Sequence, residues 1–403
     1  MVFFLGLCNN VMGIDFVADQ YKFIEKQTNN LLHITSDSTK IPRSLNINGS
    51  IKLVNIDDWT SGFFAGNLWN IYEFTGKPEW KNQAEKWTKA LEPIQYFTND
   101  HDIGFMMYCS YGNAYKLTKD KKYIAPLVNA AKSLSSRFVQ NAGIIKSWNH
   151  KVSRKGTSWD CPVIIDNMMN LELLFIVSKI TGDSRYRDIA ISHANKTLAN
   201  HVREDFSCFH VVNYDTISGK VLDKDTYQGF SKNSTWARGQ AWAVYGFTMV
   251  YRETRKIEYL ELAQKMADFY LNHSNLPKDM IPFWDFNVNQ SGYVPDWNYN
   301  LQLQTSVPRD ASAAAIMASA LLELGTFSTK KTVYFNAAKH ILRSLSTEKY
   351  RMNSQSANSF VVNHSVGNYP AGSEIDVPLI YADYYYTEAL NRYSLIKTQN
   401  SIY

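Results

Sequence analysis

The chain has 403 residues, of which 45% are hydrophobic and 14% aromatic, so it can bury a large core and is not expected to be disordered. Its net charge of +5 is mild and no basic tract occurs, which argues against a nucleic-acid partner. No apolar run reaches the roughly 18 residues that a transmembrane helix needs, so no membrane span is expected.

Hydrophobic residues recur with helical periodicity in twelve segments along the chain. The amphipathic segments, which carry charged faces, are 15–32, 79–97, 121–138, 185–200, 257–273 and 332–347. Between them alternate segments that are apolar nearly all round, at 59–75, 103–118, 163–181, 236–254, 310–327 and 376–392. Helices that are apolar on every side are buried, whereas amphipathic helices meet solvent. The alternation predicts an all-α fold, an (α/α)6 barrel of six inner and six outer helices spanning 14–395 as one catalytic domain.

A short phrase that recurs five times supports this architecture. A Thr is followed by an aromatic residue five positions later and usually by an Ala four positions after that, as in Thr75, Trp80 and Ala84. Further copies begin at Thr118, Thr181, Thr254 and Thr329. Each copy ends one helical pattern and opens the next, so the repeat unit is a helix–turn–helix. The segment 376–392 is expected to pack against 15–32 and close the ring.

The connections between repeats are long, at 33–57, 139–162, 202–235, 274–309 and 349–375. Long loops in a compact domain are usually functional, and all of these enter the first turns of the apolar helices. One face of the barrel is therefore predicted to carry the active site. Within 202–230 the alternating pattern and a Gly turn predict a small β-hairpin.

Aspartates gather where these apolar helices begin. Asp102 stands in HDIGF, and Asp166 stands in the apolar run VIIDNMMN, where an ionised carboxylate is costly to bury. Burial and a second carboxylate nearby both raise the pKa of a carboxyl group, as a general acid requires. Two such groups facing a pit lined with Trp predict glycoside chemistry. The alternative is helix capping, which we favour for Asp58 and Asp310.

Several phrases resemble the unsaturated glucuronyl hydrolases of glycoside hydrolase family 88: DDWTSGFFAGNLW, HDIGF, YGNAYKLTKD, IIDNMMNLELLF, STWARGQAWAVYG, RDASAAAIMASALLEL and IYADYYYTEAL. The resemblance covers about residues 15–392 and implies the same barrel. It implies release of a 4,5-unsaturated uronic acid from the non-reducing end of oligosaccharides made by polysaccharide lyases. In that reaction a proton goes to C4 of the enol-ether double bond, water adds at C5, and the hemiketal opens and expels the aglycone.

The resemblance also implies roles for individual residues. Asp166 matches the acid/base aspartate of the family, and Asp102 matches the partner that tunes its pKa. The positions that match substrate-binding residues are His210, Gln228 and Arg238, together with three stacking rings, Trp59, Trp148 and Trp242. For each of them a structural role is the alternative; His210 and Gln228 could be satisfied loop residues, and Arg238 could pair with an acidic neighbour.

In one loop the sequence departs from the family pattern. Members that favour sulfated glycosaminoglycan fragments share a Ser/Ser/Lys pattern before the last inner helix, and HSVGNYPAGSEIDVPLIYADYYY has no obvious equivalent. Unsulfated glycosaminoglycan fragments and other uronate polysaccharides such as ulvan stay open as substrates. Alternatives are the related unsaturated rhamnogalacturonyl hydrolases, which act on pectin fragments, a non-catalytic sugar-binding barrel, and a sugar epimerase, which would need paired catalytic histidines.

Neither a metal nor another cofactor is expected. Cys8, Cys109, Cys161 and Cys208 show no CxxC spacing, and the nine histidines form no HExxH motif, so buried reduced thiols are the default interpretation. The expected partner is the unsaturated uronyl oligosaccharide alone, with the protein a monomer or weak dimer. Residues 1–13 are either the remnant of an export signal, which would place the protein in a bacterial periplasm, or a disordered terminus of a cytoplasmic protein.

Overall fold

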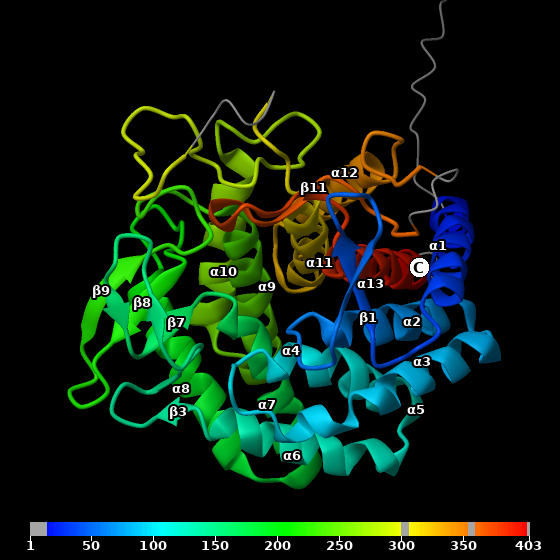
Figure 1. The fold of residues 1–403 in the computed structure, drawn as a ribbon, viewed down its shortest axis with the longest axis horizontal. Helices are drawn as coiled ribbons and strands as arrows, with labels where there is room; N and C mark the ends of the chain where they lie inside the picture. The colour runs from blue at the N-terminus through cyan, green and yellow to red at the C-terminus, as the bar shows by residue number, and fades with distance from the viewer. Residues whose placement is uncertain (1–13, 300–305, 354–358, 401–403) are drawn as a thin grey trace, which may run out of the picture.

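A computed structural model describes residues 14–299, 306–353 and 359–400 (Figure 1). The expectations for residues 1–13, including Cys8, lie outside this described part. Cys109, Cys161 and Cys208 are buried free thiols, as expected. Among the described residues, none of the helices has the combination of length and hydropathy that crossing a bilayer requires.

Two concentric rings of helices make up the molecule, which confirms the (α/α)6 barrel (Figure 1). The inner ring consists of α2 (Ser61–Thr75), the consecutive segments α4 (Ile103–Met107), η2 (Tyr108–Gly112) and α5 (Asn113–Thr118), then α7 (Asn167–Thr181), α9 (Ala237–Thr254), α11 (Ala311–Phe327) and α13 (Ile380–Asn400). Each inner helix packs on the next, and α13 packs on α2. The outer ring consists of α1 (Ile14–Ile34), α3 (Pro78–Ala90), α6 (Ile124–Ser135), α8 (Ser184–His201), α10 (Ile257–Asn272) and α12 (Lys331–Leu345), with short 3₁₀ turns at η1 (Glu92–Tyr96) and η3 (Lys121–Tyr123).

Polar contacts between α1 and α13 close the ring between the two ends of the chain. The Tyr21 hydroxyl donates to Asn391 Oδ1 at 2.5 Å, and the Tyr386 hydroxyl donates to Gln20 Oε1 at 3.2 Å. Both contacts are buried, so they hold the two helices in one register. The predicted pairing of 376–392 with 15–32 is confirmed.

The recurring Thr ends each inner helix by a shared set of hydrogen bonds. The Thr75 hydroxyl donates to the carbonyl of Ile71 at 2.8 Å and accepts from the Lys77 amide at 3.3 Å. Thr118, Thr181 and Thr254 repeat both bonds. In the fifth copy Ser328, not Thr329, accepts the amide two residues on, from Lys330 at 3.0 Å, so the phrase starts one residue earlier there than the spacing predicts.

The aromatic residue of the repeat joins neighbouring outer helices. The indole of Trp80 donates to Glu25 on α1, and the Tyr259 hydroxyl donates to Asn195 on α8. The Tyr334 hydroxyl donates in the same way to Asp268 on α10 at 3.2 Å. The aromatic residue of these repeats thus bonds to the preceding outer helix. Because the repeat recurs along the chain, the same contact recurs around the outer ring.

Short strands occur in the loops that precede the inner helices. The predicted hairpin is confirmed as β8 (Val211–Tyr214) and β9 (Val221–Asp225), and β7 (Pro162–Ile164) extends it to three antiparallel strands. Further pairs that the sequence did not predict are β1 (Ile41–Leu45) with β2 (Ile51–Val54), β3 (Phe138–Val139) with β4 (Ile144–Ile145), β5 (Lys151–Val152) with β6 (Ser158–Trp159), and β10 (Ser365–Asn368) with β11 (Ser373–Val377). The predicted helices at 163–181 and 376–392 were therefore placed too early, since β7 and β11 hold their first residues.

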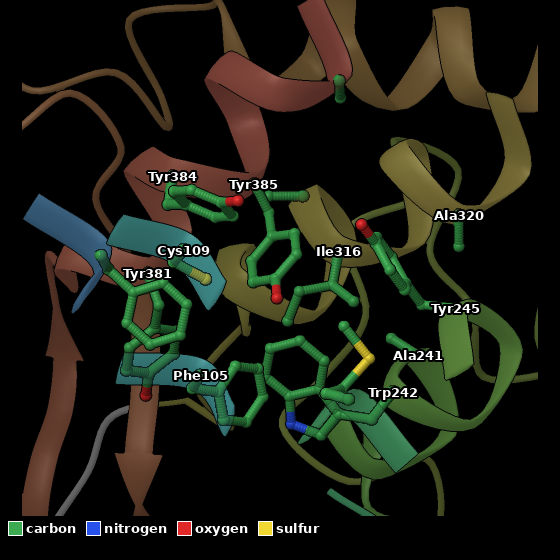
Figure 2. Packing of buried hydrophobic residues seen from close by; sticks show 14 of the residues in the cluster. Phe105, Cys109, Ala241, Trp242, Tyr245, Ile316, Ala320, Tyr381, Tyr384 and Tyr385 are labelled. Atoms are coloured by element: carbon green, nitrogen blue, oxygen red, sulfur yellow. The ribbon is translucent and has the colours of Figure 1, made fainter. Parts of the chain in front are cut away.

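Two glycines allow the inner helices to approach closely. A Cβ on Gly62 of α2 would lie 2.3 Å from the Met106 carbonyl oxygen, and a Cβ on Gly104 of α4 would lie 2.5 Å from the Asn170 Cα. Both clashes are with backbone, which cannot move without shifting a helix. Figure 2 shows the ring-rich packing toward the barrel axis, where Trp242 lies 5.3 Å from Phe105 and 5.1 Å from Tyr385 between ring centroids.

We predict that Gly104→Ala lowers the free energy of unfolding by about 1–3 kcal/mol, because an overpacked helix contact must open. Gly325→Ala on α11 is the matched control, since its Cβ would meet only the side chain of Phe335, which can rotate. Urea denaturation of both variants measures the difference. If both variants lost the same free energy of unfolding, the close backbone approach at Gly104 would not be the cause of the loss.

Candidate active site

A cavity of about 380 Å³ opens at the loop end of the barrel. Asp102 and Asp166 both line it, so the structure brings the two predicted carboxylates to one space. Trp59, Trp148, Gln228 and Arg238 also line it, whereas His210 and Trp242 do not. The remaining walls are Arg43, Asp57, Asp58, Phe97, Asp100, Met106, Lys151, Ile164, Tyr227, Gly367, Asn368 and Tyr381.

Asp166 immediately precedes α7, but its side chain makes no capping hydrogen bond. The carboxylate is nearly buried, and Oδ2 has no hydrogen-bond partner among the residues that the structure describes. Burial raises the pKa of Asp166 to about 7, against the opposing charge of Arg238 and with a smaller raising effect of Asp100. Such a group is partly protonated near neutral pH and can give up its proton to a bound molecule.

Asp102 occupies the corresponding position before α4 and likewise does not cap its helix. Its Oδ1 accepts from the Asn170 amide nitrogen at 3.3 Å. Burial raises the pKa of Asp102 well above its usual range, and the charges of Asp100 and Asp166 raise it further. The two carboxylates therefore hold fewer than two negative charges near neutral pH.

His101 faces Asp102 as a neutral donor. The Asn170 Oδ1 accepts from the Phe105 amide at 2.7 Å, which fixes its amide nitrogen toward His101 Nδ1 at 3.1 Å. Nδ1 is therefore an acceptor, and the ring proton lies on Nε2, 3.4 Å from Asp102 Oδ1 and 3.5 Å from Asp100 Oδ1. Burial lowers the pKa of His101 to about 4, so the ring is uncharged near neutrality.

His210 has the same relation to Asp166, from behind the cavity wall. Its Nδ1 accepts from the amides of Tyr227 at 2.9 Å and Gln228 at 3.2 Å, so the proton lies on Nε2, which faces Asp166 Oδ2 at 3.6 Å. Burial and Arg238 hold the pKa of His210 well below its usual range. We expected His210 to contact the sugar. In the structure its ring does not line the cavity and lies between Asp166 and the Gln228 backbone. The Gln228 side chain does reach the cavity, donating to the Gly367 carbonyl at 3.1 Å.

Arg238 is buried and already paired. Its Nη1 donates to Asp310 Oδ2 at 3.0 Å and to the Val366 carbonyl, and its Nη2 donates to the Gly367 carbonyl at 2.6 Å. Only Nε has no partner. Arg238 therefore does pair with an acidic neighbour, Asp310, as the structural alternative predicts. Its side chain still lines the cavity and holds a positive charge beside Asp166.

Asp310 and Asp58 both make local hydrogen bonds. Asp310 caps α11 by accepting from the amides of Ser312 and Ala313, as predicted. Asp58 accepts from the Thr60 amide at 2.9 Å and binds Arg43 at 2.7 Å. Neither group is left unpaired in the way that Asp166 is.

The three predicted stacking rings differ in depth. Trp59 and Trp148 are half-buried on the cavity wall, where a sugar face can reach them. Trp242 is fully buried and packs against Phe105 and Tyr385 (Figure 2), so it does not form part of the cavity wall. Its indole Nε1 has no hydrogen-bond partner among the described residues.

Sequence reasoning missed several wall residues, among them Asp100, Arg43, Lys151, Tyr227 and Tyr381. Asp100 lies two residues before Asp102, and its half-exposed carboxylate could have been found from that spacing. Arg43 and Lys151 come from strands of loop hairpins, which no pattern in the sequence assigns to the pit.

Asp100, His101 and Asp102 offer three ligand atoms within 4.8 Å of one another, an arrangement that could accept a cation. The proton on His101 Nε2 already lies between the two carboxylates, so the three groups are compatible without a metal. A larger cavity of about 910 Å³ lies beside Arg309, Lys349 and His364. It holds neither Asp102 nor Asp166, and Asp279 binds both Arg309 and Lys349, so the smaller cavity, which holds both predicted carboxylates, is the candidate site.

Comparisons with known proteins show the family of the chain. The profile of Glycosyl Hydrolase Family 88 matches residues 33–397. An unsaturated glucuronyl hydrolase from Formosa agariphila is 45% identical over 93% of this chain and 90% of its own length, and an unsaturated chondroitin disaccharide hydrolase from Streptococcus agalactiae is 31% identical over 92% and 90%. A crystal structure of an unsaturated glucuronyl hydrolase specific for heparin superposes with a TM-score of 0.89 at 44% identity, covering 96% of this chain and 99% of that one. The chain is a glycoside hydrolase and belongs to Glycosyl Hydrolase Family 88.

Proposed function

We propose that this protein releases a 4,5-unsaturated uronic acid from the non-reducing end of lyase-generated oligosaccharides, with Asp166 as the acid/base. One observation carries the assignment of Asp166. It is the cavity carboxyl whose burial raises the pKa to about 7 while one oxygen stays without a partner. A protonated carboxyl is needed at the start of the reaction, and a carboxylate is needed when water attacks.

The protein groups account for each step of the reaction. Protonated Asp166 gives its proton to C4 of the double bond, and positive charge develops at C5 and the ring oxygen. The Asp166 carboxylate then accepts a proton from the water that adds to C5. The hemiketal opens, and the hemiacetal left at C1 expels the aglycone without a covalent glycosyl-enzyme intermediate.

The neighbouring groups keep Asp166 ready for both roles. Neutral His210 turns its Nε2 toward Asp166 Oδ2 at 3.6 Å, too far for a hydrogen bond, and does not neutralise the carboxylate. The second carboxylate, Asp102, favours retention of a proton in the pair. Asp102 is in turn positioned by Asn170 and by neutral His101. We assign Asp102 to tuning and orienting the proton relay.

Two alternatives differ from this proposal in observable ways. A pectin-specific enzyme would use the same carboxylates on an unsaturated rhamnogalacturonan disaccharide, so a panel of unsaturated disaccharides, followed by loss of the ultraviolet absorbance of the conjugated double bond, separates the two. A non-catalytic binding barrel would leave that absorbance unchanged with every substrate. The presence of both carboxylates in one cavity favours the enzyme.

We also propose that the protein acts as a monomer or weak dimer, because one chain already brings both carboxylates and two aromatic walls to one cavity. We propose a periplasmic location if residues 1–13 are the remnant of an export signal.

We predict that Asp166→Asn lowers kcat by at least about 10²-fold, since an amide cannot transfer the proton. The same variant should be at least as stable as the parent protein at pH 8, because the folded parent must bury an ionised carboxylate there. Activity on unsaturated disaccharide and thermal unfolding measure the two effects.

Asp383→Asn is the matched control for this variant. Burial raises the pKa of Asp383 to about 7 as well, but its carboxylate accepts from the amides of Val361 and Val362 and does not line the cavity. The Asp383→Asn variant should be less stable than the parent, but its folded molecules should have the parental kcat. Parental turnover by Asp166→Asn would refute the acid/base assignment.

We predict that kcat/KM falls about tenfold per pH unit above a midpoint near pH 7, because the pKa of Asp166 is raised to about 7 and only its protonated form can start the reaction. Asp100→Asn should move this alkaline limb to lower pH, since the charge of Asp100 raises the pKa of Asp166. Asp57→Asn, which alters an exposed carboxylate on the same cavity, should leave the limb in place. An unmoved limb in Asp100→Asn would show that another group titrates.

A further inference from the structure

The cavity has three Lys or Arg side chains on its wall, and carboxylates already bind two of them. Arg43 donates to Asp58 and Glu374, each at 2.7 Å, and Arg238 donates to Asp310. Lys151 has no carboxylate oxygen within 4.0 Å in the part of the chain that the structure describes. It is therefore the wall cation with an unused positive charge.

Lys151 lies over two aromatic rings of the wall. Its Nζ is 5.3 Å from the ring centroid of Trp148 and 4.8 Å from that of Tyr227. Arg154 lies over the same Tyr227 ring at 4.6 Å and donates to two neutral acceptors, the Tyr227 carbonyl and Asn368 Oδ1. Two cations that have no acidic partner among the described residues thus flank the ring pair Trp148–Tyr227.

This ring pair is close to the reacting end of the substrate. The Trp148 ring centroid is 6.5 Å from that of His210, whose Nε2 is 3.6 Å from Asp166 Oδ2. With C4 of the uronate at Asp166, the anomeric carbon lies across the sugar ring from it. The attached sugar therefore begins about one sugar ring from Asp166, within reach of Trp148 and Tyr227, whose rings it can contact.

We propose that Lys151 and Arg154 form a subsite for a sulfate on the sugar attached to the unsaturated uronate. This subsite rests on the proposed function, because it places the uronate at Asp166. A sulfate held by Lys151 and Arg154 gains charge-assisted hydrogen bonds from cations that no protein carboxylate neutralises. Stacking on Trp148 and Tyr227 orients the sugar that carries it.

The subsite uses a different loop from the Ser/Ser/Lys pattern of sulfate-preferring relatives. Residues 359–379, which precede α13, contain neither Lys nor Arg. Lys151 belongs to β5, in the connection before α7. The lack of that pattern in this chain is thus compatible with sulfate recognition from another side of the cavity.

The test compares Lys151→Met with the parent protein on unsaturated disaccharides that share one backbone and differ only in sulfation. We expect the parent to prefer a sulfated member. In Lys151→Met, kcat/KM for that member should fall about tenfold through KM, while the unsulfated member changes by less than about twofold. The loss should shrink as ionic strength rises, because the interaction is partly exposed.

Two variants serve as controls. Lys151→Arg keeps the charge and should retain most of the preference. Lys224→Met removes a similar cation, 5.2 Å from the Phe209 ring but away from the cavity, and should leave both substrates unaffected.

The outcomes separate this subsite from the proposed function. If the parent hydrolyses no unsaturated disaccharide, the proposed function and the subsite both fail. If the parent is active but prefers unsulfated substrates, or if Lys151→Met loses activity equally on both members, the subsite fails and the proposed function stands.

Discussion

The chemistry of this protein depends on keeping two carboxylates buried at one end of a barrel without binding a cation directly to either. At the opposite end of the barrel, buried and half-buried glutamates outside the candidate site are paired with arginines. There Arg252 binds Glu172, Glu253 and Glu323, and Arg392 binds Glu323 and Glu388. Arg252 and Arg392 hold the pKa of Glu323 below its usual range against the effect of burial. At the cavity, the polar neighbours of the two acids include Asn170 and neutral histidines, so the energetic cost of burial appears as a raised pKa.

The position of these aspartates is set by how the first turns of α4 and α7 satisfy their backbone. The Phe105 amide donates to Asn170, and the amides of Met168 and Met169 donate to the carbonyls of Ile165 and Asp166. The carboxylates of Asp102 and Asp166 are therefore not needed as caps. At α11 the amides of Ser312 and Ala313 have no such acceptor, and Asp310 supplies it. An Asp therefore precedes three inner helices. Asp310 caps its helix, whereas the carboxylates of Asp102 and Asp166 make no capping hydrogen bond.

The sequence predicts the barrel well because periodicity reports burial, and burial is what distinguishes the two rings. It fails by a few residues at 163–166 and 376–377, where apolar residues continue from a strand into a helix and the two patterns merge. Asp166 is predictable as a site residue because an Asp inside an apolar run is costly, whereas Asp102 is assigned from its place before an inner helix and from the family resemblance. The sequence does not predict that Trp242 and His210 lie behind the cavity wall. Their burial depends on which other side chains cover them, and those side chains come from segments far apart in the chain. The wall cations Arg43 and Lys151 were missed for the same reason.

The two parts of the site also differ in what holds them. The carboxylates stand on inner helices that touch through Gly104 and Asn170, so a change there alters the whole barrel. Arg43, Lys151 and Tyr227 stand on loop segments, where Arg43 binds Asp58 and Lys151 lies over the Tyr227 ring. Loops can change length and charge without disturbing the helix contacts that place Asp102 and Asp166. The proposed proton relay and the proposed sulfate subsite therefore belong to separate structural layers, and substitutions in the loops can change the second without altering the first.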